Sequence, residues 1–137
     1  MRVLVDTNVW LDILQDRRPF YEASARALTI LEHPEYKAYM GATTVTTLFY
    51  LLSKHAGSTR AVEVIGELLK RYKIALVDAA VLRAALATGF DDFEDAVLHE
   101  AACHAGLDAI VTRDVRGFIG ATLPIYTPIE LIAAYEK

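Results

Sequence analysis

Acidic residues stand at three places where predicted strands give way to helices or loops. Asp6 follows the apolar run at 2–5, and Asp114 closely follows the run at 109–112. A third acidic group, at 91–95, opens a helical stretch. The carboxyl ends of parallel strands meet at one edge of a sheet, so we expect these carboxylates to converge. Converging carboxylates repel one another unless they bind a proton or a cation, and oxygen ligands alone favour Mg²⁺ or Mn²⁺.

Each of these acids also has a simpler interpretation as a helix cap. Aspartate is a good N-cap, so Asp6 could serve only to start the helix that follows it. Asp91, Asp92 and Glu94 could serve only to complement the dipole of the helix that they open. For one junction alone, capping is the more economical explanation. The second strand-to-acid junction, at 112–114, is what favours a shared site.

A zinc site is a less favoured alternative. No set of histidines and cysteines has zinc spacing, and Asp95, His99 and Cys103 form only a weak stripe at i, i+4 and i+8 of a helix. Cys103 is the single cysteine and lies among alanines. We expect a buried, inert thiol there, and an internal disulfide is excluded.

Length and composition predict one domain over residues 1–137. The chain has 137 residues, of which 54% are hydrophobic, and a formal net charge of -4. An acidic balance argues against a protein that coats nucleic acid through bulk positive charge. No apolar run reaches the roughly 18 residues of a membrane span, so we expect a cytoplasmic protein with no membrane partner.

The alternation of strand and helix patterns indicates how the acids are positioned. Strands alternating with helices predict a parallel α/β sheet with crossover helices on both faces. We expect the segment 114–123 to be irregular. The predicted strands are 2–5, 36–42, 74–77, 109–112 and a short edge strand at 124–126, and the predicted helices are 9–14, 19–33, 43–54, 59–72, 78–86, 92–105 and 128–135.

Taken together, these motifs resemble the PIN-domain ribonucleases, which include the VapC-type toxins of bacterial and archaeal toxin–antitoxin pairs. The resemblance covers nearly the whole chain. It implies a three-layer α/β/α fold with sheet order 3-2-1-4-5, hydrolysis of RNA with Mg²⁺ or Mn²⁺, frequently a homodimer, and for a toxin an antitoxin partner. It rests on Asp6-Thr7-Asn8, on Asp92-Phe93-Glu94-Asp95-Ala96, and on Thr112-Arg113-Asp114 followed by Gly117-Phe118.

The resemblance assigns roles to individual acids. Asp6, Asp95 and Asp114 match the catalytic, metal-binding acids of the family. The family usually carries a glutamate in the helix after the second strand, and Thr47 stands there. A threonine cannot supply the missing charge, so metal affinity and activity should be weaker. Asp92, one turn before Asp95, or the Thr47 hydroxyl acting through water could substitute.

Polar residues beside these acids have two interpretations each. Asn8 and Thr112 could orient the carboxylates or a metal-bound water, although capping explains either residue equally well. Arg113 and Arg116 flank Asp114 and could contact RNA phosphates, or they could be two solvated side chains of a loop.

The leading interpretation is a metal-dependent endoribonuclease, the toxin of a toxin–antitoxin pair. The alternative is a catalytically weakened PIN-fold binding or regulatory module, which Thr47 favours. A phosphatase with an aspartate nucleophile ranks last, because it needs a second acid where Asn8 stands. The apolar residues at 48–52, 62, 65, 68 and 69 exceed what one sheet face should cover, which predicts self-association.

Overall fold

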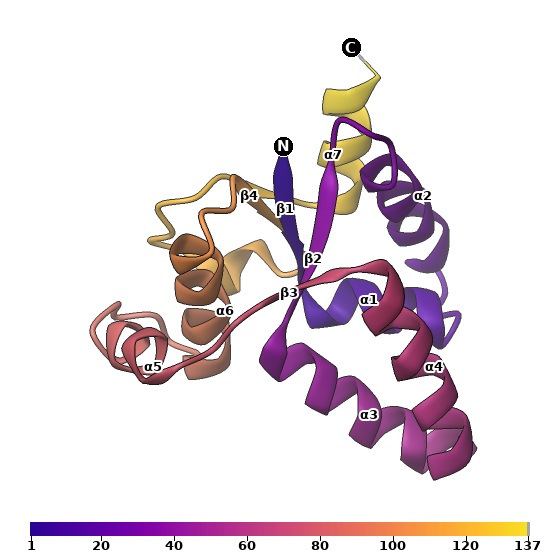
Figure 1. Ribbon diagram of the computed structural model, residues 1–137. Helices are drawn as coiled ribbons and strands as arrows, with labels where there is room; N and C mark the ends of the chain where they lie inside the picture. Colours follow the sequence, from indigo (N-terminus) through magenta and orange to yellow (C-terminus); the bar gives the residue numbers. More distant parts are fainter. Residues whose placement is uncertain (137) are drawn as a thin grey trace.

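The centre of the fold is a five-stranded parallel sheet (Figure 1), seen in a computed structural model that describes residues 1–136. The strand order is β3-β2-β1-β4-β5, and every neighbouring pair is parallel. This confirms the predicted fold class and sheet order. The strands are β1 (Arg2–Val5), β2 (Lys37–Gly41), β3 (Lys73–Ala75), β4 (Ala109–Val111) and β5 (Ile125–Tyr126).

Helices cover both faces of the sheet. In Figure 1, α5 and α6 lie on one side of it and α1, α2 and α7 on the other, while α3 and α4 extend away as a pair. The helices are α1 (Thr7–Leu14), α2 (Tyr21–Leu31), α3 (Ala42–Ala56), α4 (Ser58–Arg71), α5 (Ala79–Leu86), α6 (Phe93–His104) and α7 (Pro128–Tyr135), with a 3₁₀ turn η1 (Val115–Phe118).

Two predicted segments differ from the structure. The third strand ends at Ala75 instead of residue 77, because the chain leaves the sheet edge there and Leu76 is 74% exposed. The segment expected to be irregular contains η1, which packs the buried ring of Phe118 beneath it. The other predicted elements appear within a few residues of their expected bounds.

Apolar side chains fill the space on both faces of the sheet. Along β1, Val3 and Val5 enter the core beneath α1, α2, α3, α4 and α7, while Leu4 enters the core beneath α5 and α6. A strand that is buried on both faces needs apolar side chains at successive positions, which explains why residues 3–5 are all apolar. Burial on both sides also fixes the carboxyl ends of β1 and β4 next to each other, since Val5 is in register with Val111.

The predicted caps bound the helices around this sheet. Asp78 Oδ1 accepts a hydrogen bond from the Val81 backbone N–H at 3.0 Å, and Thr127 and Glu130 form the predicted capping box of α7. Gly106 follows α6 with a φ of +70°, a conformation that favours glycine. Among residues 1–136, no helix is long and apolar enough to cross a membrane.

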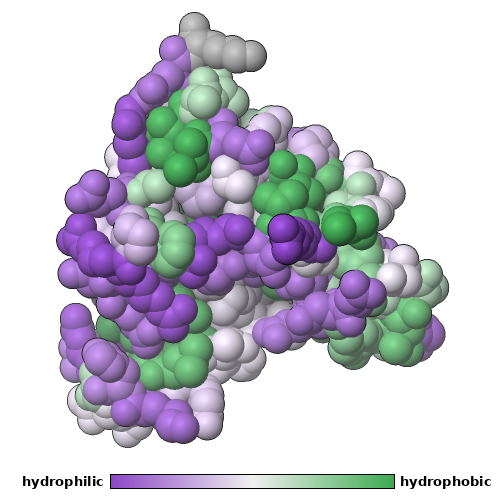
Figure 2. All heavy atoms as spheres, turned by 180° about the vertical axis from the view of Figure 1, so that it is seen from behind, coloured by the Kyte–Doolittle hydropathy of each residue, from purple (hydrophilic) through white to green (hydrophobic). Residues whose placement is uncertain are grey.

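The apolar surplus of α3 and α4 is only partly buried. Leu48, Leu52 and Ile65 belong to the core. Tyr50 and Val62 are 59% and 60% exposed, and Phe49 and Leu69 are also exposed. Figure 2 shows that apolar area on the far side of the molecule occurs in several separate patches among hydrophilic residues. Part of the surface predicted to support self-association therefore remains accessible on this chain.

Candidate active site

Asp6 is a helix cap and a member of the acidic site at once. It follows β1 and is only 5% exposed. Its Oδ1 accepts a hydrogen bond from the Thr7 backbone N–H at 2.7 Å, which caps α1. Its Oδ2 accepts a hydrogen bond from the Thr112 hydroxyl at 2.7 Å. The two interpretations of Asp6 are thus compatible, since capping uses one oxygen and the other faces the end of β4.

The Thr112 hydroxyl joins the ends of β1 and β4. It is fully buried, donates to Asp6, and accepts from the backbone N–H of Asp114 at 2.9 Å. Asn8 approaches the same hydroxyl with Nδ2 at 3.4 Å, and its Oδ1 accepts from the Arg113 backbone N–H at 3.2 Å. These bonds fix where Asp6 and Asp114 sit relative to each other, as expected of residues that orient carboxylates.

Asp95 reaches the same place from the first turn of α6. A Cβ atom on residue 117 would collide with Asp95 Oδ2 and would lie 3.1 Å from Asp114 Oδ2. Gly117 therefore lets η1 approach α6 closely enough to bring these two carboxylates together. Any larger residue at 117 would push one of them out of place.

The electrostatics of the cluster show that it lacks positive charge. Burial raises the pKa of Asp95 to about 7, and the charges of Asp6, Asp92, Asp114 and Glu94 add to that increase. Burial also raises the pKa of Asp6, although its hydrogen bond from Thr112 opposes the change. Carboxylates in this condition are stabilised by a proton or by a cation.

The donor set fits a hard divalent cation. Only carboxylate and hydroxyl oxygens converge here, which are the ligands that Mg²⁺ and Mn²⁺ prefer. The arrangement is open. Within the described residues 1–136, the ligand atoms of Asp6, Asp95 and Asp114 do not all lie within 4.8 Å of one another. An open set suits Mg²⁺, which keeps several water molecules and needs only one or two protein carboxylates.

Asp92 serves chiefly as the N-cap of α6. Its Oδ1 accepts hydrogen bonds from the backbone N–H groups of Glu94 and Asp95, at 2.8 and 3.2 Å. The capping interpretation of Asp92 is therefore confirmed, and only its second oxygen is free of these bonds.

The two arginines of the last motif differ in their surroundings. Arg113 Nε donates to the buried carboxylate of Asp12 at 2.6 Å, and its guanidinium carbon lies 3.8 Å from the centroid of the Phe20 ring. Its charge is thus already balanced. Arg116 lies on η1, is exposed, and has no ion pair within residues 1–136. Of these two arginines, Arg116 is therefore the one whose positive charge is available to bind a phosphate.

The His99 group of α6 has a structural role. His99, Glu100 and Cys103 bring three potential ligand atoms within 4.8 Å of one another. However, His99 Nε2 accepts from the Thr122 backbone N–H at 3.1 Å, which places the ring proton on Nδ1, beside Glu100 Oε2 at 2.7 Å. Both ring nitrogens are therefore occupied. Burial raises the pKa of the Cys103 thiol, in keeping with an inert cysteine.

The sequence matches the family model of the PIN domain over residues 2–116. The chain belongs to the PIN domain family. Ribonuclease VapC1 of Aquifex aeolicus is 27% identical over 134 residues, which is 94% of this chain and 92% of that protein. Among solved structures, VapBC-1 of nontypeable Haemophilus influenzae has a TM-score of 0.73 at 17% identity, covering 94% of this chain and 99% of that one. A toxin–antitoxin complex from Klebsiella pneumoniae has a TM-score of 0.69 at 20% identity, covering 92% and 97%.

This PIN domain has a threonine pair near Asp6 that the motifs did not reveal. Thr47, where the family's glutamate was expected, makes no side-chain hydrogen bond within residues 1–136. One turn earlier in α3, the buried Thr44 hydroxyl lies 2.8 Å from the hydroxyl of Thr7. Thr7 directly follows Asp6, so it is Thr44 that ties α3 to this edge of the sheet.

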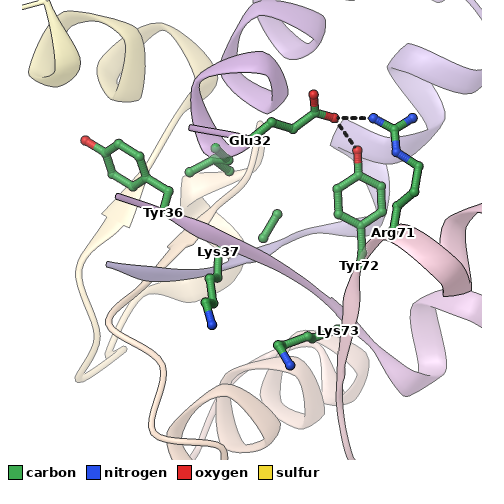
Figure 3. Close-up of a pocket in the computed structure, with 8 residues that line it drawn as sticks. Glu32, Tyr36, Lys37, Arg71, Tyr72 and Lys73 are labelled. Carbon is green, nitrogen blue, oxygen red and sulfur yellow. Dashed lines mark hydrogen bonds and ion pairs between the residues drawn. The ribbon is translucent and has the colours of Figure 1, made fainter. Parts of the chain in front are cut away.

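The PIN domain also has a hollow at the opposite edge of the sheet, at the start of β2 and β3 (Figure 3). Glu32 closes one wall by accepting from Arg71 at 2.8 Å and from the Tyr72 hydroxyl at 2.7 Å. Burial and the bond to Glu32 raise the pKa of Tyr72. The acids lie at the carboxyl ends of the strands, so this hollow of about 390 Å³ does not belong to their site.

Replacing Thr112 with valine should destabilise the PIN domain by about 1–3 kcal/mol. The shape is kept, but the buried Asp6 Oδ2 loses its donor, and unsatisfied buried acceptors cost about that much. Thermal unfolding of wild type and Thr112→Val measures the effect. Thr122→Val, whose exposed hydroxyl lies outside the acidic site, is the matched control. Equal melting temperatures for wild type and Thr112→Val would show that the hydroxyl does not support Asp6.

Proposed function

We propose that this PIN domain is a divalent-metal-dependent endoribonuclease, the toxin of a toxin–antitoxin pair that acts in the cytoplasm. The observation that carries the proposal is the meeting of Asp6, Asp95 and Asp114 at the carboxyl edge of the sheet, where burial and then the neighbouring acids raise the pKa of Asp95. The name of the Aquifex aeolicus relative, a ribonuclease, supports the same activity.

In this proposal Asp6, Asp95 and Asp114 hold Mg²⁺ or Mn²⁺. The bound ion would activate water and stabilise the charge that develops on the scissile phosphate. Thr112 and the Thr7 backbone N–H hold the Asp6 carboxylate in one orientation. Asp95 must give up its proton before the site can bind a cation. Arg116 attracts the RNA backbone to the open side of the site.

A cleavage assay on varied single-stranded RNAs tests the proposal. We expect weak cleavage that is stronger with Mn²⁺ than with Mg²⁺ and that stops with EDTA. Mn²⁺ binds a depleted oxygen site more strongly and is less demanding in geometry. If no RNA is cleaved with either ion, the alternative of a PIN-fold binding or regulatory module, which Thr47 favours, replaces the enzyme.

Replacing Thr47 with glutamate should increase the cleavage rate and tighten metal binding. The substitution restores a negative charge to the helix position where the family usually has one, and a carboxylate can attract or coordinate the cation. A Mn²⁺ titration of the cleavage rate should reach half-maximum at about tenfold lower metal. Thr46→Glu, on the exposed neighbouring position, is the control. If Thr47→Glu cleaves RNA no faster than Thr46→Glu, a carboxylate at position 47 does not contribute to the site.

The proposal includes two protein partners. The first is an antitoxin, by analogy with the toxin–antitoxin complex from Klebsiella pneumoniae.

The second is another copy of this chain, through the exposed apolar residues of α3 and α4. Sedimentation velocity at micromolar concentration should show a dimer, and Val62→Glu should shift it towards monomer because it places a charge in the interface. Ile119→Glu, at a 76% exposed position outside α3 and α4, should leave the dimer intact. A wild type that sediments only as monomer would refute the dimer.

A further inference from the structure

A cavity of about 350 Å³ lies beside the candidate active site, between the first turns of α2 and α7. Its walls include Phe20, Arg113, Pro128 and Ile129, and we name it the α2–α7 cavity. Two of these side chains are large, apolar and unusually exposed, since Phe20 is 42% and Ile129 69% accessible. Exposed apolar walls around a hollow indicate a binding surface.

Arg113 connects this cavity to the acids. Its backbone N–H donates to Asn8, and its chain neighbours are Thr112, which binds Asp6, and Asp114. Its side chain turns the other way and forms a wall of the cavity. Asp12, its ion-pair partner, lies six residues after Asp6 in the chain, or about 9 Å along the axis of α1. A strand of RNA bound at the acids would therefore pass within reach of the cavity.

Several polar groups around the cavity are paired with one another. Arg113 Nε and the Ser24 hydroxyl both donate to Asp12 Oδ2, at 2.6 and 2.9 Å, and Asp12 is fully buried. The Thr127 hydroxyl accepts from the Glu130 backbone N–H in the capping box. The charge of Arg113 is balanced by Asp12, so the cavity has little attraction for a phosphate. What remains is the contact of the Arg113 guanidinium with the Phe20 ring, between apolar walls.

Such a surface suits an uncharged planar ring. Nucleobases stack on aromatic rings and on arginine planes without regard to their identity, because every base has a π-face. Stacking of this kind binds any base, so we expect the cavity to contribute affinity more than base specificity. We propose that the α2–α7 cavity holds an unstacked base of the RNA strand next to the scissile phosphate, with Phe20 and Arg113 as the stacking surface. This rests on the proposed ribonuclease function and adds a substrate-positioning pocket to it.

The test is methyl NMR of the full chain labelled at isoleucine, in EDTA so that no RNA is cleaved. The probes are hexaadenylate and an abasic strand with the same ribose-phosphate backbone. We expect hexaadenylate to shift the Ile129 methyl signal and the abasic strand to leave it unchanged. Ile65, which lies on α4 and outside the cavity, should respond to neither. Phe20→Ala should weaken hexaadenylate binding about tenfold, the usual effect of losing one stacking partner, without affecting the abasic strand.

Four outcomes would overturn the proposal in distinguishable ways. If hexaadenylate is cleaved with Mn²⁺ but leaves Ile129 unshifted, the pocket fails and the ribonuclease stands. If both strands shift Ile129 equally, the cavity binds backbone instead of bases. If no RNA binds or is cleaved, the proposed function fails as well. Because Phe20→Ala also removes the partner of Arg113, Ile129→Ala is the second variant. A normal RNA affinity in both variants, with loss of binding to a protein partner, would assign the cavity to that partner.

Discussion

Replacing Asp6, Asp95 or Asp114 singly with asparagine should lower metal-dependent RNA cleavage by roughly 100-fold or more. Each substitution removes a negative charge and a strong oxygen ligand while keeping the shape of the side chain. Stabilisation of transition-state charge by a metal ion is worth several kcal/mol. Because the site already lacks the usual glutamate, it has few other carboxylates to replace the one that is removed. Initial rates at saturating Mn²⁺ measure the effect.

The matched control for these variants is Asp91→Asn. Asp91 belongs to the same acidic stretch and is exposed, but it is not among the charges that raise the pKa of Asp95. We expect its activity to stay near that of wild type. If Asp91→Asn loses as much activity as Asp6→Asn, the effect comes from the overall negative charge of this edge. The three-acid site would then be wrong.

Without metal, the folded protein should lose stability as the pH rises from about 4 to about 7. Burial and neighbouring acids raise the pKa of Asp95 to about 7, from an ordinary value of 3.8. Between these two values the folded state binds a proton that the unfolded state has released, so a rise in pH favours unfolding. The shift corresponds to about 4 kcal/mol in full. Asp95 is partly accessible, so screening by solvent reduces this to about 2 kcal/mol.

Melting temperatures in EDTA between pH 4.5 and 8 measure this change. Other groups titrate in the same range, so the informative quantity is the difference between wild type and Asp95→Asn. We expect Asp95→Asn to lose less stability than wild type over this range by several degrees. At pH 8, Mn²⁺ should raise the melting temperature of wild type and have little effect on Asp95→Asn. Parallel pH profiles for the two proteins would contradict the raised pKa.

The sequence was sufficient for the fold because its signals are local. The run at 2–5 is apolar at every position, as a strand buried on both faces must be, and the structure confirms it as β1. The Thr127 capping box and the Asp78 cap are also read from neighbouring residues and appear where expected. Strand order followed from the resemblance to PIN domains, and the observed sheet confirms it.

The details of the site depend on contacts between distant segments, which no local pattern reports. Gly117 was recognised as part of a motif, but its need to lack a side chain is evident only with Asp95 packed against it. The sequence leaves the role of Arg113 open between phosphate contact and solvation, because its partner Asp12 lies 101 positions away. Thr44 is separated from Thr7 by 37 positions, so no local pattern indicates that it contacts this edge of the sheet.

The bond between Thr112 and Asp6 has a consequence for how the protein is made. It joins residues 106 positions apart, so the acidic site cannot assemble until the ribosome has synthesised β4 and the strand has emerged. Translation proceeds at about 5–20 residues per second, which leaves a nascent chain without its third acid for several seconds. Truncated products that end before Asp114 lack that acid permanently. The nuclease proposed here would therefore be harmless to the ribosome and messenger that produce it until β4 and Asp114 have emerged.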